Sequence, residues 1–163
     1  MSRITPCLWF DGKAEEAAQF YVSLLPDSHI DGVLRSPAGN PSTPAGAVLT
    51  VDFTVAGQKF QGLNGGPDFT FNEAVSFQID CEDQAEVDRL WNALSENGGQ
   101  PGPCGWIKDR FGLSWQVIPR VLGRMLSDPD TEAAGRAMEA MLKMGKMEVA
   151  ELESAFRGEL TSA

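Results

Sequence analysis

The chain has 163 residues, of which 42% are hydrophobic, and a formal net charge of −10. This length and apolar content predict one packed domain or two small fused modules, and argue against a disordered chain. The acidic balance argues against nucleic acid as a partner, because a phosphate backbone would be repelled. No apolar stretch reaches the roughly 18 residues of a membrane helix, and no signal-peptide pattern opens the chain. We therefore expect a cytoplasmic protein with no membrane partner.

The first half of the chain reads as a strand, a helix and three further strands. Glu15 in the first turn suits a helix N-terminus, and Pro26 ends the helical pattern. Apolar residues alternate with Thr50, Asp52 and Thr54, which is typical of a half-buried strand. The predicted elements are the strand 4–10, the helix 11–25 and the strands 29–35, 49–55 and 59–64.

The second half repeats this order at an offset of 70 residues. The apolar stripe Ala17, Phe20, Tyr21 and Leu24 recurs as Val87, Leu90, Trp91 and Leu94. Asp83 followed by Glu86 resembles a capping box at the start of the second helix. The predicted elements are the strand 74–80, the helix 81–95, a proline-weakened strand near 100–104, and a hairpin of 106–108 with 113–118.

Beyond the repeat, residues 121–156 read as short helices, one of them starting at Asp130 or Thr131. Met138, Met141, Leu142 and Met144 are predicted to form the apolar side of that helix, which packs on the domain or on a partner subunit. The segment 36–46 (SPAGNPSTPAG) is a loop that is either a lid or a connector. We predict a domain 1–118, with modules 1–67 and 71–118, and a helical extension 119–163.

Cysteine and histidine content limits the chemistry. The cysteines Cys7, Cys81 and Cys104 include no Cys-x-x-Cys pair, so neither a disulfide framework nor a zinc site is predicted, and His29 is the only histidine. Cys104, in a Pro-Cys-Gly loop, is either a nucleophile or an inert thiol. Asp52 is either a general base or a solvated strand residue.

Five segments carry a resemblance to a known family: TPCLWFDGKAEEA (5–17), LNGGP (63–67), FNEA (71–74), CEDQAEVD (81–88) and PCGWIKDRFGLSWQVIP (103–119). They resemble the PhnB-like family of the vicinal oxygen chelate superfamily, which includes glyoxalases, bleomycin-resistance proteins and extradiol dioxygenases. The family is often labelled 3-demethylubiquinone-9 3-methyltransferase. The similarity runs from Ile4 to about Phe156.

The resemblance implies an α+β fold in which two tandem βαβββ modules form a curved mixed sheet around a cavity, followed by the helical tail. Strand parity places Ser76, Gln78 and Gln116 on the polar, cavity-facing side. The candidate ligand-binding residues are Asn64, Ser76, Gln78, Trp106, Gln116, Asp52 and Cys104.

Metal-dependent members of the superfamily supply His or Glu from the first and last strand of each module. The matching positions here fall near Ile4, Ala74 and Asn64 and on Gln116. Side-chain amides are poor ligands for Zn, Fe, Ni or Mn, so we predict no metal and no cofactor. A weak, water-rich site near Asn64 stays open as an alternative.

We therefore predict that the chain binds a small, partly aromatic or polar metabolite in its cavity without a metal. The alternative is an enzyme of the PhnB-like family with unplaced catalytic groups or a weak divalent-metal site. A third possibility is an oligomerisation module. The Gly-rich turn of a Rossmann-type methyl-donor site is not readable in the sequence. We also expect a homodimer, because the sheet edges need cover.

Overall fold

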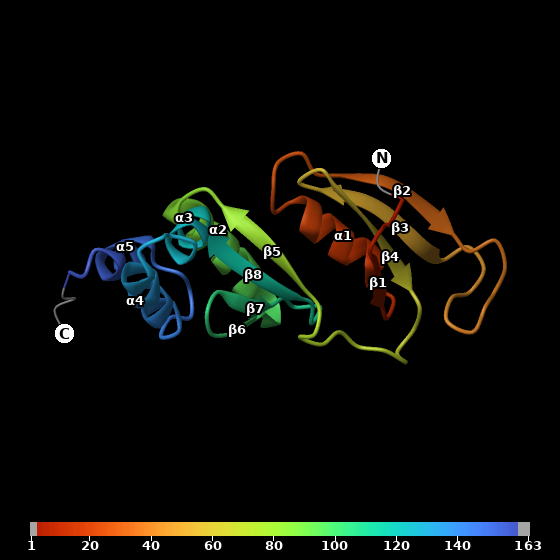
Figure 1. Ribbon diagram of the computed structural model, residues 1–163. Coiled ribbons are helices and arrows are strands. Elements are labelled where there is room, and N and C mark those ends of the chain that lie inside the picture. The colour runs from red at the N-terminus through yellow and green to blue at the C-terminus, as the bar shows by residue number, and fades with distance from the viewer. Residues whose placement is uncertain (1–2, 160–163) are drawn as a thin grey trace. The chain divides into compact units, whose positions relative to one another are not determined.

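A computed structural model describes residues 3–159 (Figure 1). The chain divides into two compact units, one ending at Phe71 and the other starting at Asn72. Each unit contains one four-stranded mixed sheet with one helix packed against it, and three more helices belong to the second unit. The predicted α+β class with two tandem modules and a helical tail is confirmed. None of the helices within residues 3–159 is long and apolar enough to cross a membrane.

The first unit follows the predicted βαβββ order. Its sheet has the strand order β1-β4-β3-β2, in which β1 is parallel to β4 and the other pairs are antiparallel. The elements are β1 (Cys7–Phe10), α1 (Ala14–Val22), β2 (His29–Arg35), β3 (Val48–Val55) and β4 (Gln58–Asn64).

The second unit repeats this topology, with the strand order β5-β8-β7-β6 and β5 parallel to β8. The proline-weakened strand is reduced to the two residues of β6, since proline cannot donate to a sheet ladder. The elements are β5 (Ser76–Cys81), α2 (Gln84–Ser95), a 3₁₀ turn (Glu96–Gly98), β6 (Gln100–Pro101), β7 (Trp106–Lys108) and β8 (Ser114–Pro119).

The apolar stripes of α1 and α2 pack against the sheets of their units, as predicted. In the first unit, Tyr21 is 1% exposed and its ring lies 6.1 Å from that of Phe53, which stacks on Phe60. In the second unit, Leu90 and Leu94 are fully buried, as is Val117 of β8. The helix-facing side of each sheet is therefore the core, and the opposite face is left for other contacts.

Helix α2 begins with a well-formed cap. The Asp83 carboxylate accepts a hydrogen bond of 2.9 Å from the Glu86 backbone N–H, and the Glu86 carboxylate accepts one of 2.7 Å from the Glu82 N–H. Two N–H groups at this helix end are thereby satisfied, in a variant of the capping box in which Glu86 reaches the residue before the N-cap Asp83.

Asp83→Ala should lower the free energy of unfolding by about 1 kcal/mol, because the cap is lost. Asp83→Ser retains a hydroxyl acceptor and should lower the free energy of unfolding much less than Asp83→Ala. Urea denaturation followed by circular dichroism measures both variants, and equal losses would contradict the role given to the side-chain oxygen.

The tail contains α3 (Arg120–Leu126), α4 (Thr131–Met141) and α5 (Val149–Phe156). Asp130 caps α4 by accepting from the N–H groups of Glu132 and Ala133, at 3.1 and 3.0 Å. The core of the tail is formed by Leu122, Met125, Ala133, Ala137, Met147 and Leu152.

The predicted apolar side of α4 is only partly right. Met144 is buried, but Met138 is 46% and Leu142 60% exposed. The buried side of α4 instead presents Ala133 and Ala137, small residues that let α4 pack against α3 and α5.

Candidate ligand-binding site

Two rows of side chains cross the open face of the second sheet. Trp106 of β7 pairs with Gln116 of β8, which pairs with Gln78 of β5. The next row consists of Lys108, Ser114 and Ser76. Residues paired directly across strands point to the same face, and the alternating residues Ile107, Trp115 and Val117 are buried on the α2 side. The six residues of the two rows therefore share the face opposite α2.

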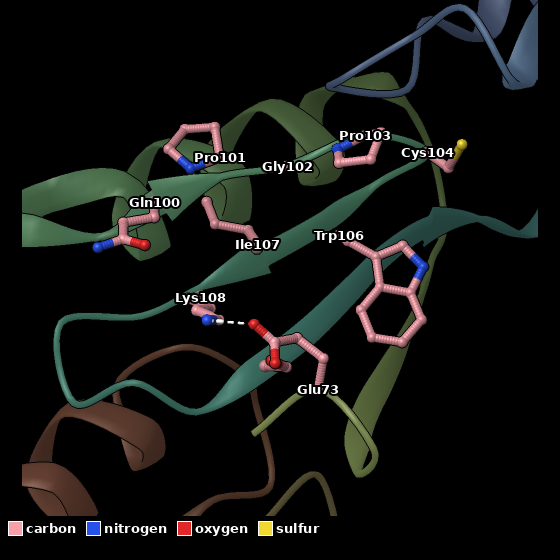
Figure 2. A pocket seen from close by; sticks show the side chains of 10 residues that line it. Glu73, Gln100, Pro101, Gly102, Pro103, Cys104, Trp106, Ile107 and Lys108 are labelled. Atoms are coloured by element: carbon pink, nitrogen blue, oxygen red, sulfur yellow. Dashed lines mark ion pairs between the residues drawn. The ribbon is translucent and has the colours of Figure 1, made fainter. Parts of the chain in front are cut away.

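A pocket of about 550 Å³ lies over part of this face (Figure 2). This volume is within the range of small-molecule sites, roughly 300–1,000 Å³. The Trp106 ring and the prolines before it supply apolar wall, and Glu73 and Lys108 supply charge. The pocket is lined by Glu73, Gln100, Pro101, Gly102, Pro103, Cys104, Trp106, Ile107, Lys108 and Ser114.

Ser114 carries the most informative polar atom of the pocket. Its side chain is 1% exposed, and within residues 3–159 its Oγ has no hydrogen-bond partner. An unsatisfied buried hydroxyl costs about 1–3 kcal/mol, and such groups are rare in folded proteins. Lys108 lies directly opposite Ser114 on β7. A hydroxyl and an ammonium side by side are both donors, so together they suit an acceptor oxygen.

An ion pair closes this polar end of the pocket. The Lys108 ammonium contacts the Glu73 carboxylate, as Figure 2 shows. The hydrogen bond from Lys108 holds the pKa of Glu73 below its usual value. Glu73 is 59% exposed, and exposed ion pairs contribute little stability. Glu73 can therefore leave Lys108 at low cost when another oxygen takes its place.

The turn Pro103–Gly105 forms one end of the pocket. Cys104 and Gly105 both have positive φ, at 55° and 79°. Their backbone N–H groups donate to the carbonyls of Met144 and Gly145 in the tail, each at 2.8 Å. Tail residues thus hold a turn that lines the pocket.

The structure brings five of the seven predicted site residues to this unit. Trp106 and Cys104 line the pocket. Ser76, Gln78 and Gln116 lie on the same sheet face outside its lining, where the Gln116 amide donates to the Ser76 hydroxyl at 2.9 Å.

Asn64 lies in the first unit and has a structural role. Its side-chain oxygen accepts from the Ala14 N–H at the start of α1, and its NH₂ donates to the Val48 carbonyl, both at 2.9 Å. The side chain is 8% exposed. Asn64 shares strand parity with the core residue Phe60, a signal that the sequence contains.

Asp52 also lies in the first unit, on the outer face of β3. Its carboxylate accepts from the Gln61 amide at 2.9 Å, and it borders a pocket of about 310 Å³ that also includes Asp31 and Lys59. Asp31 in turn accepts from the Thr54 hydroxyl at 2.7 Å.

The metal positions implied by the superfamily do not suit a metal in this chain. Ile4 and Ala74 precede β1 and β5 and have no ligand atoms in their side chains. The oxygen of Asn64 is taken by the Ala14 N–H, and Gln116, whose NH₂ donates to Ser76, offers one amide oxygen, a poor ligand for transition metals. Within residues 3–159, no three His, Cys, Asp or Glu side chains cluster so as to hold a metal ion.

Three pocket residues were not among the candidates predicted from the sequence: Ser114, Lys108 and Glu73. Ser114 shares parity with Gln116, which was predicted to face the cavity, and Lys108 shares parity with Trp106, a candidate ligand-binding residue, so the sequence contained a signal for both. Glu73 precedes β5 in a turn, where parity gives no signal.

A mixed sheet with one covering helix, present twice in tandem βαβββ order, is the glyoxalase fold. Residues 2–118 match the model of the family described as 3-demethylubiquinone-9 3-methyltransferase, and the chain belongs to this family. The match stops before α3, whereas the sequence resemblance was expected to extend to about Phe156. No curated protein matches the chain significantly.

Solved structures agree with this assignment. The chain is 33% identical to a PhnB protein from Bacillus cereus, described as a 3-demethylubiquinone-9 3-methyltransferase, with a TM-score of 0.64 over 72% of this chain and 99% of that one. Protein PA1353 from Pseudomonas aeruginosa is 24% identical, with a TM-score of 0.60 over 73% of this chain and 98% of that one, and shares the fold.

Proposed function

We propose that the second module binds a small planar molecule in the pocket beside Trp106, and that an acceptor oxygen of the ligand replaces the Glu73 carboxylate at Lys108 and lies between Ser114 and Lys108. The buried, unpartnered Ser114 hydroxyl in the pocket carries this proposal, because an accepting ligand would satisfy it. The Trp106 ring offers the ligand a flat apolar surface.

The family description supports the same ligand class. It names a demethylubiquinone, whose ring is planar and bears oxygen atoms. The proposal covers binding and not methyl transfer. Of the ten pocket residues none is a histidine, and the one carboxylate, Glu73, is paired with Lys108. The described sheets are also four-stranded and mixed, unlike the parallel sheet of a Rossmann-type methyl-donor site.

Calorimetric titration with 2-naphthoate, a flat ring bearing a carboxylate, tests the proposal. Ser114→Ala should weaken binding about tenfold, the effect of losing one hydrogen bond to a charged group. 2-Methylnaphthalene lacks the oxygen and should bind wild type and Ser114→Ala equally. Ser76→Ala removes a hydroxyl from the same sheet face outside the pocket lining and should leave the naphthoate affinity unchanged.

Ser114→Ala should at the same time raise the free energy of unfolding by about 1 kcal/mol, because an unsatisfied buried hydroxyl is removed. Urea denaturation of the ligand-free protein measures this. A gain in stability together with a loss of affinity is typical of a residue kept for binding. Unchanged naphthoate affinity in a folded Ser114→Ala variant would show the proposal to be wrong.

A further inference from the structure

The C-terminal tail contacts the pocket through its backbone. The segment 143–149 follows α4, ends at the first residue of α5 and passes beside the turn Pro103–Gly105. The carbonyls of Met144 and Gly145 accept hydrogen bonds from the N–H groups of Cys104 and Gly105. A Cβ added to Gly145 would lie 3.4 Å from the Gly102 carbonyl oxygen, so the segment and the turn are in close contact. The turn therefore depends on the tail for two of its hydrogen bonds.

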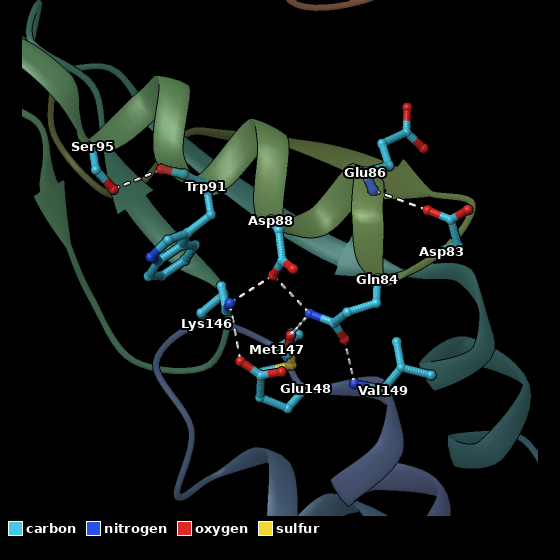
Figure 3. A network of polar contacts seen from close by, with 10 residues as sticks. All are labelled: Asp83, Gln84, Glu86, Asp88, Trp91, Ser95, Lys146, Met147, Glu148 and Val149. Atoms are coloured by element: carbon cyan, nitrogen blue, oxygen red, sulfur yellow. Dashed lines mark hydrogen bonds and ion pairs between the residues drawn. The ribbon is translucent and has the colours of Figure 1, made fainter.

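The same tail segment is attached to α2 by a polar network (Figure 3). The Gln84 side chain donates to the Met147 carbonyl at 3.0 Å and accepts from the Val149 N–H at 2.7 Å. The Lys146 ammonium contacts Asp88 of α2 at 2.6 Å and Glu148 at 3.1 Å. Gln84 and Asp88 of α2 thus contact three residues of the segment: Lys146, Met147 and Val149.

Buried packing lies beneath this network. Met147 is fully buried, and its side chain packs beside Gly105. A Cβ added to Gly105 would lie 3.4 Å from the Met147 side chain. Polar contacts from α2 and apolar packing under the turn act on the same short segment. A displacement of the segment would therefore also displace Cys104 and Gly105.

We propose that the segment 143–149 holds the pocket turn Pro103–Gly105 in place, and that Gln84 and Lys146 are positioning residues for ligand binding. The part of this inference that concerns affinity rests on the proposed function of the pocket. The tail lies outside the family match, so this chain stabilises its pocket with an element that the matched region does not contain.

The Cys104 thiol reports the position of the turn without any ligand. Cys81 is fully buried and burial raises its pKa to about 12, so it should stay silent, and Cys7→Ser removes the exposed thiol. In that background, the rate of Cys104 with dithiobis(nitrobenzoate) should rise about tenfold in Gln84→Ala or Lys146→Met, as expected when two contacts that restrain the turn are lost. Lys146→Arg keeps the charge and should keep the slow rate.

Arg136→Met is the matched control. Arg136 donates to the carbonyls of Ala155 and Phe156, at 3.0 and 2.7 Å, so it joins α4 to α5 away from the pocket turn. This variant should lose stability without a change in the Cys104 rate. An equal rise in the control would show general loosening of the tail and overturn the proposal, as would an unchanged rate in a folded Gln84→Ala.

Affinity for 2-naphthoate completes the test. Gln84→Ala and Lys146→Met should weaken binding about threefold to tenfold, and Lys146→Arg should not. A faster Cys104 reaction with unchanged affinity would overturn the positioning role. If the wild-type protein bound no 2-naphthoate, the proposed function would fail for this ligand class, together with the affinity part of the inference, and the Cys104 rates would still decide whether the tail holds the turn.

Discussion

Asp109→Ala should lower the free energy of unfolding by about 3 kcal/mol, one of the largest effects expected from a single substitution here. The Asp109 carboxylate is 2% exposed and accepts from the N–H groups of Phe111 and Leu113, at 2.8 and 3.1 Å, and from the Trp115 indole at 2.9 Å. Alanine would leave three donors without this acceptor. Urea denaturation followed by fluorescence measures the loss.

The controls separate charge from hydrogen bonding. Asp109→Asn keeps one acceptor oxygen and should lose about half as much stability, while Asp68→Ala removes an exposed carboxylate and should cost under about 0.5 kcal/mol. Because Asp109 shapes the turn between Lys108 and Ser114, Asp109→Ala should also weaken 2-naphthoate binding. Equal stability of the Asp109→Ala and Asp68→Ala variants would contradict the assigned role.

Gly105→Ala should cost about 3 kcal/mol as well, for a different reason. Gly105 has a φ of 79°, and an added Cβ would lie 2.8 Å from the Val117 carbonyl oxygen and 2.9 Å from the Ile118 side chain. Backbone strain and steric overlap therefore act together. Thermal denaturation followed by circular dichroism gives the loss.

Gly112→Ala isolates the strain, since Gly112 has a φ of 86° but nothing within 4 Å of an added Cβ. It should cost about 1 kcal/mol. Gly135→Ala lies in α4 with open space around it and should stabilise the protein by up to about 1 kcal/mol. A Gly105→Ala variant no worse than Gly112→Ala would contradict the close contact with Val117.

Much of the fold could be predicted because both helices carry the same apolar stripe at the same offset. Val87 and Leu90 are buried as their spacing implies, and β2 has its predicted bounds. The packing of the helical tail was predicted less accurately. Methionines at helical spacing indicated the buried side of α4, but the buried residues of this helix are Ala133 and Ala137, and Met138 is 46% exposed.

Only part of the candidate site could be predicted from the sequence, and strand parity explains why. Ser76, Gln78, Trp106 and Gln116 share a face because they sit in register on neighbouring strands. Asn64 was assigned by motif alignment, although it alternates in step with Phe60 and so points to α1. A shift of one residue moves a side chain to the other face of a sheet, which makes parity the more reliable guide.

Pocket residues that lie in turns could not be predicted from strand parity. Glu73 reaches Lys108 from the turn before β5, and Cys104 is placed by a left-handed turn attached to the tail. Such contacts join segments far apart in the chain and follow no periodic pattern.

The crystal structure of the protein soaked with 2-naphthoate tests the central claim most directly. We expect electron density for the ring against Trp106, with the carboxylate within hydrogen-bonding distance of Ser114 Oγ and Lys108 Nζ, and with Glu73 displaced from Lys108. An empty pocket at a saturating concentration, or density only at another site, would contradict the account.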